Sequence, residues 1–483
     1  MNEKKPYLKL LLKPHWQNDH ISYMDIKFNL EEPKIPGGEE MFAFSLSTVN
    51  IPFCEFSGAL NINDGKGIIP FHVTETEEGF IKKAKYIVDR DTEGDLSLEY
   101  RILPRVQPEG YTSSPYFDFV NEEGGANGAG VTFLPLFNEK TEYDFTIKWD
   151  LSEMPAGARG IWCLGEGEIS ALCTGQEVCF SYYAVGMLKS IEKGNFGFYW
   201  FSDPPFPVEV AGEKIRDMFL YMSDFFQDEK EPYKIFTRRN GFKGHGGTAA
   251  RRSYLFGYGT EQKNDVEDLV ALFAHEMVHN WPHLRDEPYG TTTWYSEGMA
   301  EFYCIVLTYK AGIFTLEEAL RELQKKSDNY YSNPTRSLTN DEAAKIFWTD
   351  RRTQRIPYGR GLLYIANVDA QIREASGGKR SVDDVMLEIL KIPGGGRESG
   401  TNEKWLELVS RELGRDASPE FNDMAAGKLI VPLEGCFGGA FKAVPAMFEP
   451  LNRITSHSEP ERAEGPELEG YKWELSGKSG AKI

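Results

Sequence analysis

The period of the hydrophobic pattern changes near residue 207, and this change constrains the fold more than any other feature of the sequence. Residues 22–30 alternate between apolar and polar side chains, as a half-buried strand requires. Similar stretches at 67–73, 96–103 and 142–149 are separated by turns rich in proline and glycine. The pattern predicts an N-terminal antiparallel β-sheet domain that ends near residue 205.

After Pro207 the apolar residues recur with the period of 3.6 that a helix requires. One such stripe, between residues 211 and 226, contains Ile215, Met218, Phe219 and Met222. A second predicted helix is capped by Asn264 or Asp265 and ends before Pro282, and its apolar stripe contains Val266, Leu269, Val270, Phe273 and Met277. Capping boxes at 315–318 and 381–384 begin two further helices, so we expect residues 311–430 to be mostly helical.

These patterns predict a multidomain α+β fold. An N-terminal β-sheet domain covers residues 1–205, a middle domain covers 206–310, and a mostly helical domain covers 311–450. Residues 451–483 are rich in glutamate, proline, glycine and lysine, and we expect them to form a loosely ordered tail.

Composition narrows the classes of partner. The 483 residues include 74 acidic and 54 basic side chains, a formal net charge of -20 at pH 7, which argues against nucleic acid as the main partner. The longest early apolar run, residues 7–12, contains Lys9 and is too short to span a membrane, so no membrane partner is expected. Six scattered cysteines without a CxxC pair are typical of a reducing compartment and predict a cytoplasmic protein. The oligomeric state stays open.

The segment with the most specific chemistry is Ala274-His275-Glu276-Met277-Val278-His279. On a helix, His275 and His279 lie one turn apart on the same face, so both imidazoles can bind one zinc ion. Glu276 is rotated by about 100° from His275, which suits a general base acting on zinc-bound water. The alternative is a pair of partly buried histidines that are hydrogen-bonded inside a core.

Zinc requires a third protein ligand and an open position for water. Four candidates follow the motif: His283, Asp286, Glu287 and Glu297. The metzincin pattern is excluded because Arg285 stands where that pattern needs a histidine. Glu297 begins another predicted helix, and an antiparallel helix pair would return it to the imidazoles. Glu301, one turn further, either orients a ligand histidine or lies on a solvated face.

With the segment Trp294-Tyr295-Ser296-Glu297-Gly298-Met299-Ala300, the His-Glu-x-x-His motif resembles the gluzincin peptidases. The stretches at 356–361 (Ile-Pro-Tyr-Gly-Arg-Gly) and 376–385 resemble the glycyl aminopeptidase family of gluzincins. This resemblance implies a single zinc ion with Glu297 as its third ligand, and Tyr358 as the tyrosine that stabilises the transition state. It also implies an N-terminal β domain, a thermolysin-like catalytic domain and a helical domain that completes the active site.

The sequence departs from the family in three places. The family commonly continues with a PDZ domain, and about fifty residues after Gly435 are too few for one. Arg360 stands where the family usually has lysine. Ala249 replaces the glutamate that would bind the free amine of the substrate, although the backbone of Gly246 and Gly247 can still pair with an extended peptide. A tight turn is the other interpretation of these glycines.

The sequence thus predicts a zinc-dependent peptidase in which Glu276 activates zinc-bound water, with an aminopeptidase acting on short peptides as the first expectation. Two alternatives remain. One is a zinc endopeptidase without a free-amine requirement, which Ala249 favours. The other is a catalytically inactive peptide-binding protein.

Overall fold

A computed structural model describes residues 4–49, 51–79, 81–106, 115–139, 141–228, 231–241, 245–259, 265–288, 290–347, 349–396, 399–453, 461–477 and 482–483. The chain divides into two compact units, which are described separately. The first contains residues 1–208 and 230–263, and the second contains residues 209–229 and 264–483. The domain limits expected from the sequence stay predictions.

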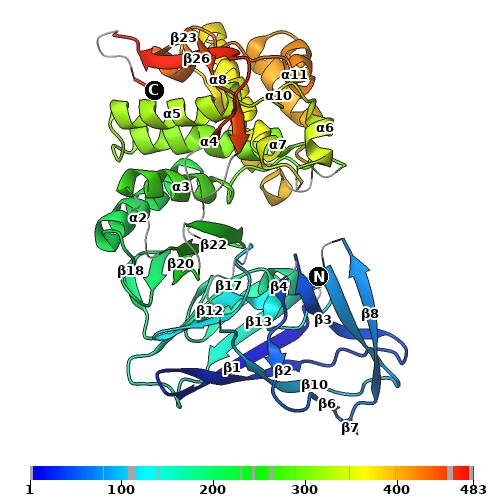
Figure 1. Cartoon of the computed structure of the whole chain (residues 1–483). Helices are drawn as coiled ribbons and strands as arrows, with labels where there is room; N and C mark the ends of the chain where they lie inside the picture. Colours follow the sequence, from blue (N-terminus) through cyan, green and yellow to red (C-terminus); the bar gives the residue numbers. More distant parts are fainter. Residues whose placement is uncertain are drawn as a thin grey trace. The chain divides into compact units, whose positions relative to one another are not determined.

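The first unit is built from β-sheets (Figure 1), as expected from its alternating pattern. Its largest sheet has the order β16-β13-β1-β2-β10-β6-β7, with β5 also paired to β10. The pairs are antiparallel except β1 with β13, which run parallel. Its strands are β1 (Tyr7–Gln17), β2 (His20–Leu30), β5 (Glu55–Phe56), β6 (Asn61–Asp64), β7 (Gly67–Ile68), β10 (Leu96–Leu103), β13 (Glu142–Trp149) and β16 (Ile169–Thr174).

Two further sheets complete most of the first unit, and one apolar core joins them to the largest sheet through residues such as Phe28, Phe42 and Tyr183. The sheet β4-β3-β9-β8 contains β3 (Glu40–Thr48), β4 (Ile51–Pro52), β8 (Phe71–Glu78) and β9 (Ile81–Val88). The sheet β11-β12-β17-β14-β15 contains β11 (Val120–Glu122), β12 (Gly125–Ala129), β14 (Arg159–Trp162), β15 (Gly165–Glu166) and β17 (Tyr182–Gly186). The single strand predicted at 67–73 is wrong, because the chain leaves β7 and enters a different sheet at β8.

The remaining sheet has the order β18-β19-β20-β22-β21, in which β19, β20 and β22 run parallel. Its strands are β18 (Lys189–Lys193), β19 (Phe196–Trp200), β20 (Tyr233–Arg239), β21 (Gly246–Ala250) and β22 (Ser253–Tyr258). The last strand in the order, β21, pairs antiparallel with β22 and lies at the edge of this sheet in the described part of the chain.

The second unit is mostly helical, as expected (Figure 1). The apolar stripe after Pro207 forms α2 (Val208–Phe225), and the helix that carries the histidine motif is α3 (Val266–Val278). Asp265 occupies the N-cap position of α3, whereas Asn264 lies outside the described residues. The others are α4 (Thr293–Lys310), α5 (Leu316–Tyr331), α6 (Asn340–Lys345), α7 (Arg351–Gln354), α8 (Ile356–Ala375), α9 (Val382–Leu390), α10 (Asn402–Leu413) and α11 (Ser418–Ala425). Both predicted capping boxes are confirmed, at the starts of α5 and α9.

The expectation of a loosely ordered tail is wrong for part of it. β26 (Leu468–Leu475) pairs antiparallel along β23 (Phe441–Phe448). Trp473 of β26 is buried, and its indole N–H donates to Ser327 Oγ of α5 at 2.9 Å. One buried tryptophan therefore holds this strand against the helical unit, despite the polar composition of the segment. Residues 454–460 and 478–481 of the predicted tail lie outside the described residues.

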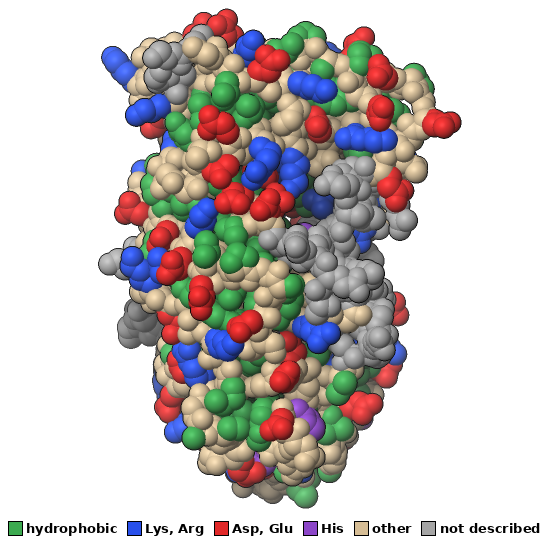
Figure 2. All heavy atoms as spheres, turned by 60° about the vertical axis from the view of Figure 1, so that its left-hand side comes forward, with side chains coloured by type: hydrophobic (Ala, Val, Ile, Leu, Met, Phe, Trp, Pro, Cys, Tyr) green, Lys and Arg blue, Asp and Glu red, His purple; other side chains and the backbone are tan. Residues whose placement is uncertain are grey.

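On the face drawn in Figure 2, acidic and basic side chains are interspersed rather than separated into regions of one sign. None of the helices in the described ranges combines the length and apolar character that crossing a membrane needs.

Candidate metal centre and active site

Two adjacent helices of the second unit bring together three side chains that could hold a metal ion. His275 and His279 lie one turn apart near the carboxyl end of α3, and Glu297 lies near the start of α4. The two Nε2 atoms are 3.3 Å apart, and Glu297 Oε2 lies 3.3 Å from His275 Nε2 and 3.7 Å from His279 Nε2. We call His275, His279 and Glu297 the ligand triad.

The triad fits a zinc ion. Metal–ligand bonds of about 2.0–2.1 Å in a tetrahedron place neighbouring donor atoms roughly 3.3–3.4 Å apart, close to the separations in the triad. Glu297 Oε2 is buried and accepts no hydrogen bond from the part of the chain that the structure describes. A buried carboxylate oxygen of this kind is costly unless a cation or a donor satisfies it.

The structure brings only one of the four third-ligand candidates to the histidines. In the described ranges, the group of side chains that could hold a metal ion contains Glu297 and neither His283, Asp286 nor Glu287. Asp286 instead accepts a hydrogen bond from the backbone N–H of Asn402 at 2.7 Å, at the start of α10.

Glu301 lies one turn after Glu297, and its Oε2 is 3.5 Å from His275 Nδ1. Its side chain is buried, so the alternative of a solvated carboxylate is excluded. The same oxygen forms an ion pair with Lys326 of α5. A carboxylate that contacts the second ring nitrogen of a ligand histidine fixes the orientation of the ring, and Lys326 in turn holds that carboxylate.

Burial and charge set the proton affinities in the absence of metal. Burial alone would lower the pKa of His275, but the Glu301 and Glu297 carboxylates outweigh it and raise that pKa to about 10. Burial lowers the pKa of His279. For Glu276, burial raises the pKa to about 7, despite the opposing effect of His275. A carboxyl group that exchanges a proton near neutral pH suits a general base.

Tyr358 completes the cluster from α8. Its ring stacks on the ring of His275, with centroids 5.7 Å apart and planes 4° from parallel. Burial raises the pKa of its hydroxyl well above the ordinary value of 10, so the phenol stays protonated and can donate a hydrogen bond. The guanidinium of Arg355 also lies over the ring of Tyr358, with the guanidinium carbon 4.8 Å from the ring centroid.

Two glycines allow α4 and α8 to approach this closely. A Cβ atom added to Gly361 would lie 2.7 Å from the Cα atom of Gly298 and closer still to the carbonyl oxygen of Trp294. Gly298 follows Glu297 directly, and Gly361 lies one helical turn after Tyr358. The backbone contact at this crossing therefore sets how near the tyrosine comes to the ligand triad.

Lys326, Arg355 and Gly361 were not predicted as site residues. The sequence could have indicated Lys326, because it lies on the same face of α5 as the buried residues Ala319, Leu323 and Tyr330, where a charged side chain requires a buried partner. Arg355 and Gly361 carried none, since their importance depends on which helix lies beside them.

The predicted substrate-binding glycines belong to the first unit. Gly246 and Gly247 lie on the edge strand β21 opposite Gly257 and Phe256 of β22, so they are not a tight turn. Ala249 on the same strand is exposed. An edge strand has unpaired backbone groups to which an extended peptide can add, and the peptide-binding role of these glycines stays a prediction.

Arg360, the other departure from the family pattern, is fully buried. Its guanidinium donates to Asn340 Oδ1 at 2.6 Å and to the carbonyl oxygens of Arg336 and Leu338 at 2.7 and 2.6 Å. Arg360 thus ties α8 to the chain between α5 and α6, which is a structural role.

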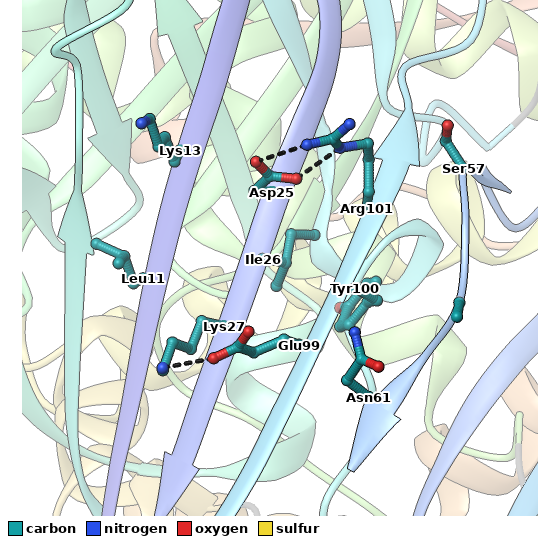
Figure 3. Close-up of a pocket in the computed structure, with 11 residues that line it drawn as sticks. Leu11, Lys13, Asp25, Ile26, Lys27, Ser57, Asn61, Glu99, Tyr100 and Arg101 are labelled. Carbon is teal, nitrogen blue, oxygen red and sulfur yellow. Dashed lines mark hydrogen bonds and ion pairs between the residues drawn. The ribbon is translucent and has the colours of Figure 1, made fainter.

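A hollow of about 420 Å³ lies on the largest sheet of the first unit (Figure 3). All of its charged side chains have partners: Arg101 donates to Asp25 at 2.7 Å, Lys27 donates to Glu99 at 2.5 Å, and Lys13 pairs with Glu153 outside the hollow at 2.7 Å. None of the triad residues lines it, and the paired charges offer no free group for chemistry.

The comparisons with known proteins agree with this geometry. Residues 268–357, which include the ligand triad and end one residue before Tyr358, match the family model of the M61 glycyl aminopeptidases. No curated protein matches the sequence.

The fold is similar to that of solved aminopeptidase structures. An aminopeptidase N family protein from Idiomarina loihiensis is 14% identical, with a TM-score of 0.66 over 90% of this chain and 79% of that chain. An M1 zinc metallopeptidase from Deinococcus radiodurans is 16% identical, with a TM-score of 0.51 over 89% of this chain and 96% of that chain. The α+β fold expected from the sequence is therefore confirmed, and residues 268–357 of this chain are similar to the M61 glycyl aminopeptidases.

Proposed function

We propose that this protein hydrolyses peptide bonds with one zinc ion held by His275, His279 and Glu297, and that it acts as an aminopeptidase on short peptides. The observation that carries the proposal is the convergence of three ligand atoms, with separations of 3.3, 3.3 and 3.7 Å, beside Glu276 and Tyr358. A zinc ion bound there supplies a Lewis acid for the substrate carbonyl and lowers the pKa of a water molecule.

Glu276 is the proposed general base. Glu276 directly follows His275 on α3, so it lies close to the triad without being part of it. Its pKa of about 7 in the metal-free protein lets it accept a proton from the attacking water and later deliver that proton to the leaving amine.

Tyr358 is the proposed donor to the oxyanion. The half-buried phenol keeps its proton and can donate a hydrogen bond to the carbonyl oxygen as negative charge develops on it. Stacking on His275 keeps the ring beside the triad. Glu301 and Lys326 act indirectly, because they hold His275 in the orientation that its ligand role needs.

The decisive experiment combines metal content with activity. Elemental analysis of the purified protein is expected to give one zinc per chain, and Glu276→Gln is expected to retain that zinc while losing turnover of short peptides with free N-termini. Glu267→Gln, a change on the same helix at a residue paired with Lys214, is the control and keeps both properties. A Glu276→Gln protein that cleaves peptides at the wild-type rate would refute the mechanism.

A zinc endopeptidase is the second candidate, favoured by the exposed methyl group of Ala249 where the family has an amine-binding glutamate. A matched pair of peptides with free and acetylated N-termini separates the two candidates. Loss of cleavage on acetylation supports the aminopeptidase, whereas equal cleavage of both supports the endopeptidase. A zinc-loaded protein that binds but never cleaves either peptide would instead be an inactive peptide-binding protein.

A further inference from the structure

One arginine beside the ligand triad has no anionic partner in the part of the chain that the structure describes. Arg355 lies at the junction of α7 and α8, as the C-cap of one helix and the N-cap of the other. Its side chain is half-buried, and within the described ranges its guanidinium lies against the ring of Tyr358, with the guanidinium carbon 4.8 Å from the ring centroid, and forms no hydrogen bond or ion pair. The hydrogen-bond donors of its guanidinium are therefore available.

Neighbouring arginines differ from Arg355 in this respect. Arg352, three residues earlier, pairs with Asp350 at 3.0 Å. Arg360, five residues later, donates to an amide oxygen and two carbonyl oxygens and is fully buried. Both have structural partners, whereas the Arg355 guanidinium pairs with no anion among the residues that the structure describes.

The charge of Arg355 reaches the groups proposed to act on the peptide bond. Burial raises the pKa of Glu276 and of Tyr358, and in both cases Arg355 opposes that effect by favouring the ionised form. Arg355 is thus electrostatically close to the proposed base and to the proposed oxyanion donor. A substrate whose carbonyl meets Tyr358 therefore lies near this guanidinium, whose carbon is 4.8 Å from the centroid of the Tyr358 ring.

The chemistry of the side chain defines the class of group that it binds. A guanidinium is a planar fork of five N–H donors that matches the two oxygens of a carboxylate, and it remains charged at all physiological pH values. Its N–H groups reach an anionic oxygen at about 2.8 Å. One peptide residue spans about 3.3–3.6 Å, so a bound carboxylate belongs within about two residues of the scissile bond.

We propose that Arg355 is a specificity-determining residue that binds a carboxylate of the peptide substrate close to the scissile bond. The carboxylate is either an acidic side chain next to that bond or the C-terminal carboxylate of a very short peptide. This inference rests on the proposed peptidase function and adds the substrate class to it.

The test measures kcat/KM of the zinc-loaded enzyme on four peptides with free N-termini: Ala-Ala-Ala amide, Ala-Ala-Ala acid, Ala-Gln-Ala amide and Ala-Glu-Ala amide. The acid against the amide tests the terminal carboxylate, and glutamate against glutamine tests the side chain. A charge-assisted hydrogen bond predicts a preference of about 10- to 100-fold for one carboxylate peptide over its neutral partner. Arg355→Gln should reduce that ratio to near one, and Arg355→Lys should retain part of it because the charge remains without the fork.

Arg352→Gln is the matched control, since it removes a positive charge whose partner is Asp350, and it should keep the wild-type ratio. Calorimetric binding of the same peptides to zinc-loaded Glu276→Gln protein, with and without Arg355→Gln, gives a readout independent of turnover and should show the same ratio. If Arg355 only holds the ring of Tyr358, Arg355→Gln lowers kcat for all four peptides equally, and the proposal is overturned.

The outcomes separate this inference from the proposed function. Cleavage by the wild type without any charge preference, or a preference that survives in Arg355→Gln, overturns the carboxylate site and leaves the peptidase intact. A zinc-loaded wild type that cleaves none of the four peptides overturns the proposed function, and the inference falls with it.

Discussion

The crossing of α4 and α8 provides the sharpest prediction, because its geometry is set by backbone rather than by flexible side chains. Gly361→Ala adds a methyl group 2.7 Å from the Cα atom of Gly298, whereas ordinary van der Waals contact begins at 3.4 Å. The two helices must therefore separate by about 0.7 Å or more, and the closer contact with the Trp294 carbonyl increases this distance. We expect the variant to lose about 1–3 kcal/mol of folding free energy.

The functional consequence follows from which residues each helix carries. Glu297 lies on α4, packed with the histidines of α3, whereas Tyr358 lies on α8. Separation of α4 and α8 therefore displaces the tyrosine from the triad and leaves the three ligands together. A misplacement of this size costs up to about 100-fold in rate, so we expect kcat on a short peptide to fall by roughly 10- to 100-fold with zinc content unchanged.

Steady-state kinetics, zinc analysis and urea unfolding of the variant check this reasoning. Ala370→Gly, further along α8, is the control, because it weakens the helix by about 0.5–1 kcal/mol without touching the crossing and should keep kcat. Tyr358→Phe combined with Gly361→Ala should be little slower than Tyr358→Phe alone, since both act on one hydroxyl. A Gly361→Ala enzyme with wild-type kcat, or one that loses its zinc, would show that the crossing does not position the tyrosine.

Three further predictions concern the same cluster. Tyr358→Phe should lower kcat by about 10²- to 10³-fold with little change in KM and full zinc content; a variant that raises KM alone would contradict the oxyanion role. Glu301→Gln and Lys326→Met should each destabilise the protein by up to about 3–5 kcal/mol, because each removes the nearest opposite charge from a largely buried side chain, and the double variant should lose less than the sum in urea unfolding; strict additivity would argue against the pair. Because His275 has a pKa of about 10 without metal, it is protonated at pH 8, so zinc binding must displace its proton and the apparent zinc affinity should rise with pH up to about 10; calorimetry in buffers of different ionisation heat measures this release, and its absence would contradict the pKa.

The fold class and the placement of His275 and His279 on one face of a helix were predictable because they depend on local periodicity. A spacing of four residues on a helix places His275 and His279 on one face whatever surrounds the helix. The capping boxes of α5 and α9 were predictable for the same reason, since each is satisfied within one turn of the chain. Alternation with a period of two likewise predicted β2, β10 and β13.

Local sequence patterns did not predict the structure where a segment pairs with a partner far away in the sequence. The polar segment around Trp473 looked unstructured because the partner that orders it, β23, lies some twenty residues earlier, and Ser327 lies on another helix. The stretch 67–73 was divided between two sheets by pairing partners that no local pattern reveals.

By itself, the sequence determined that His275, Glu276 and His279 share one turn of a helix, and family resemblance selected Glu297 as the partner of the two imidazoles. Only the tertiary structure decided which of the acidic residues reaches the imidazoles, that Lys326 holds Glu301, and that the Arg355 guanidinium lies over the ring of Tyr358. The physical reason is that a helical repeat is fixed by covalent geometry over a few residues, whereas contacts between side chains of different helices depend on how closely whole helices pack. Here α4 and α8 can pack this closely because Gly298 and Gly361 have no side chains at the crossing.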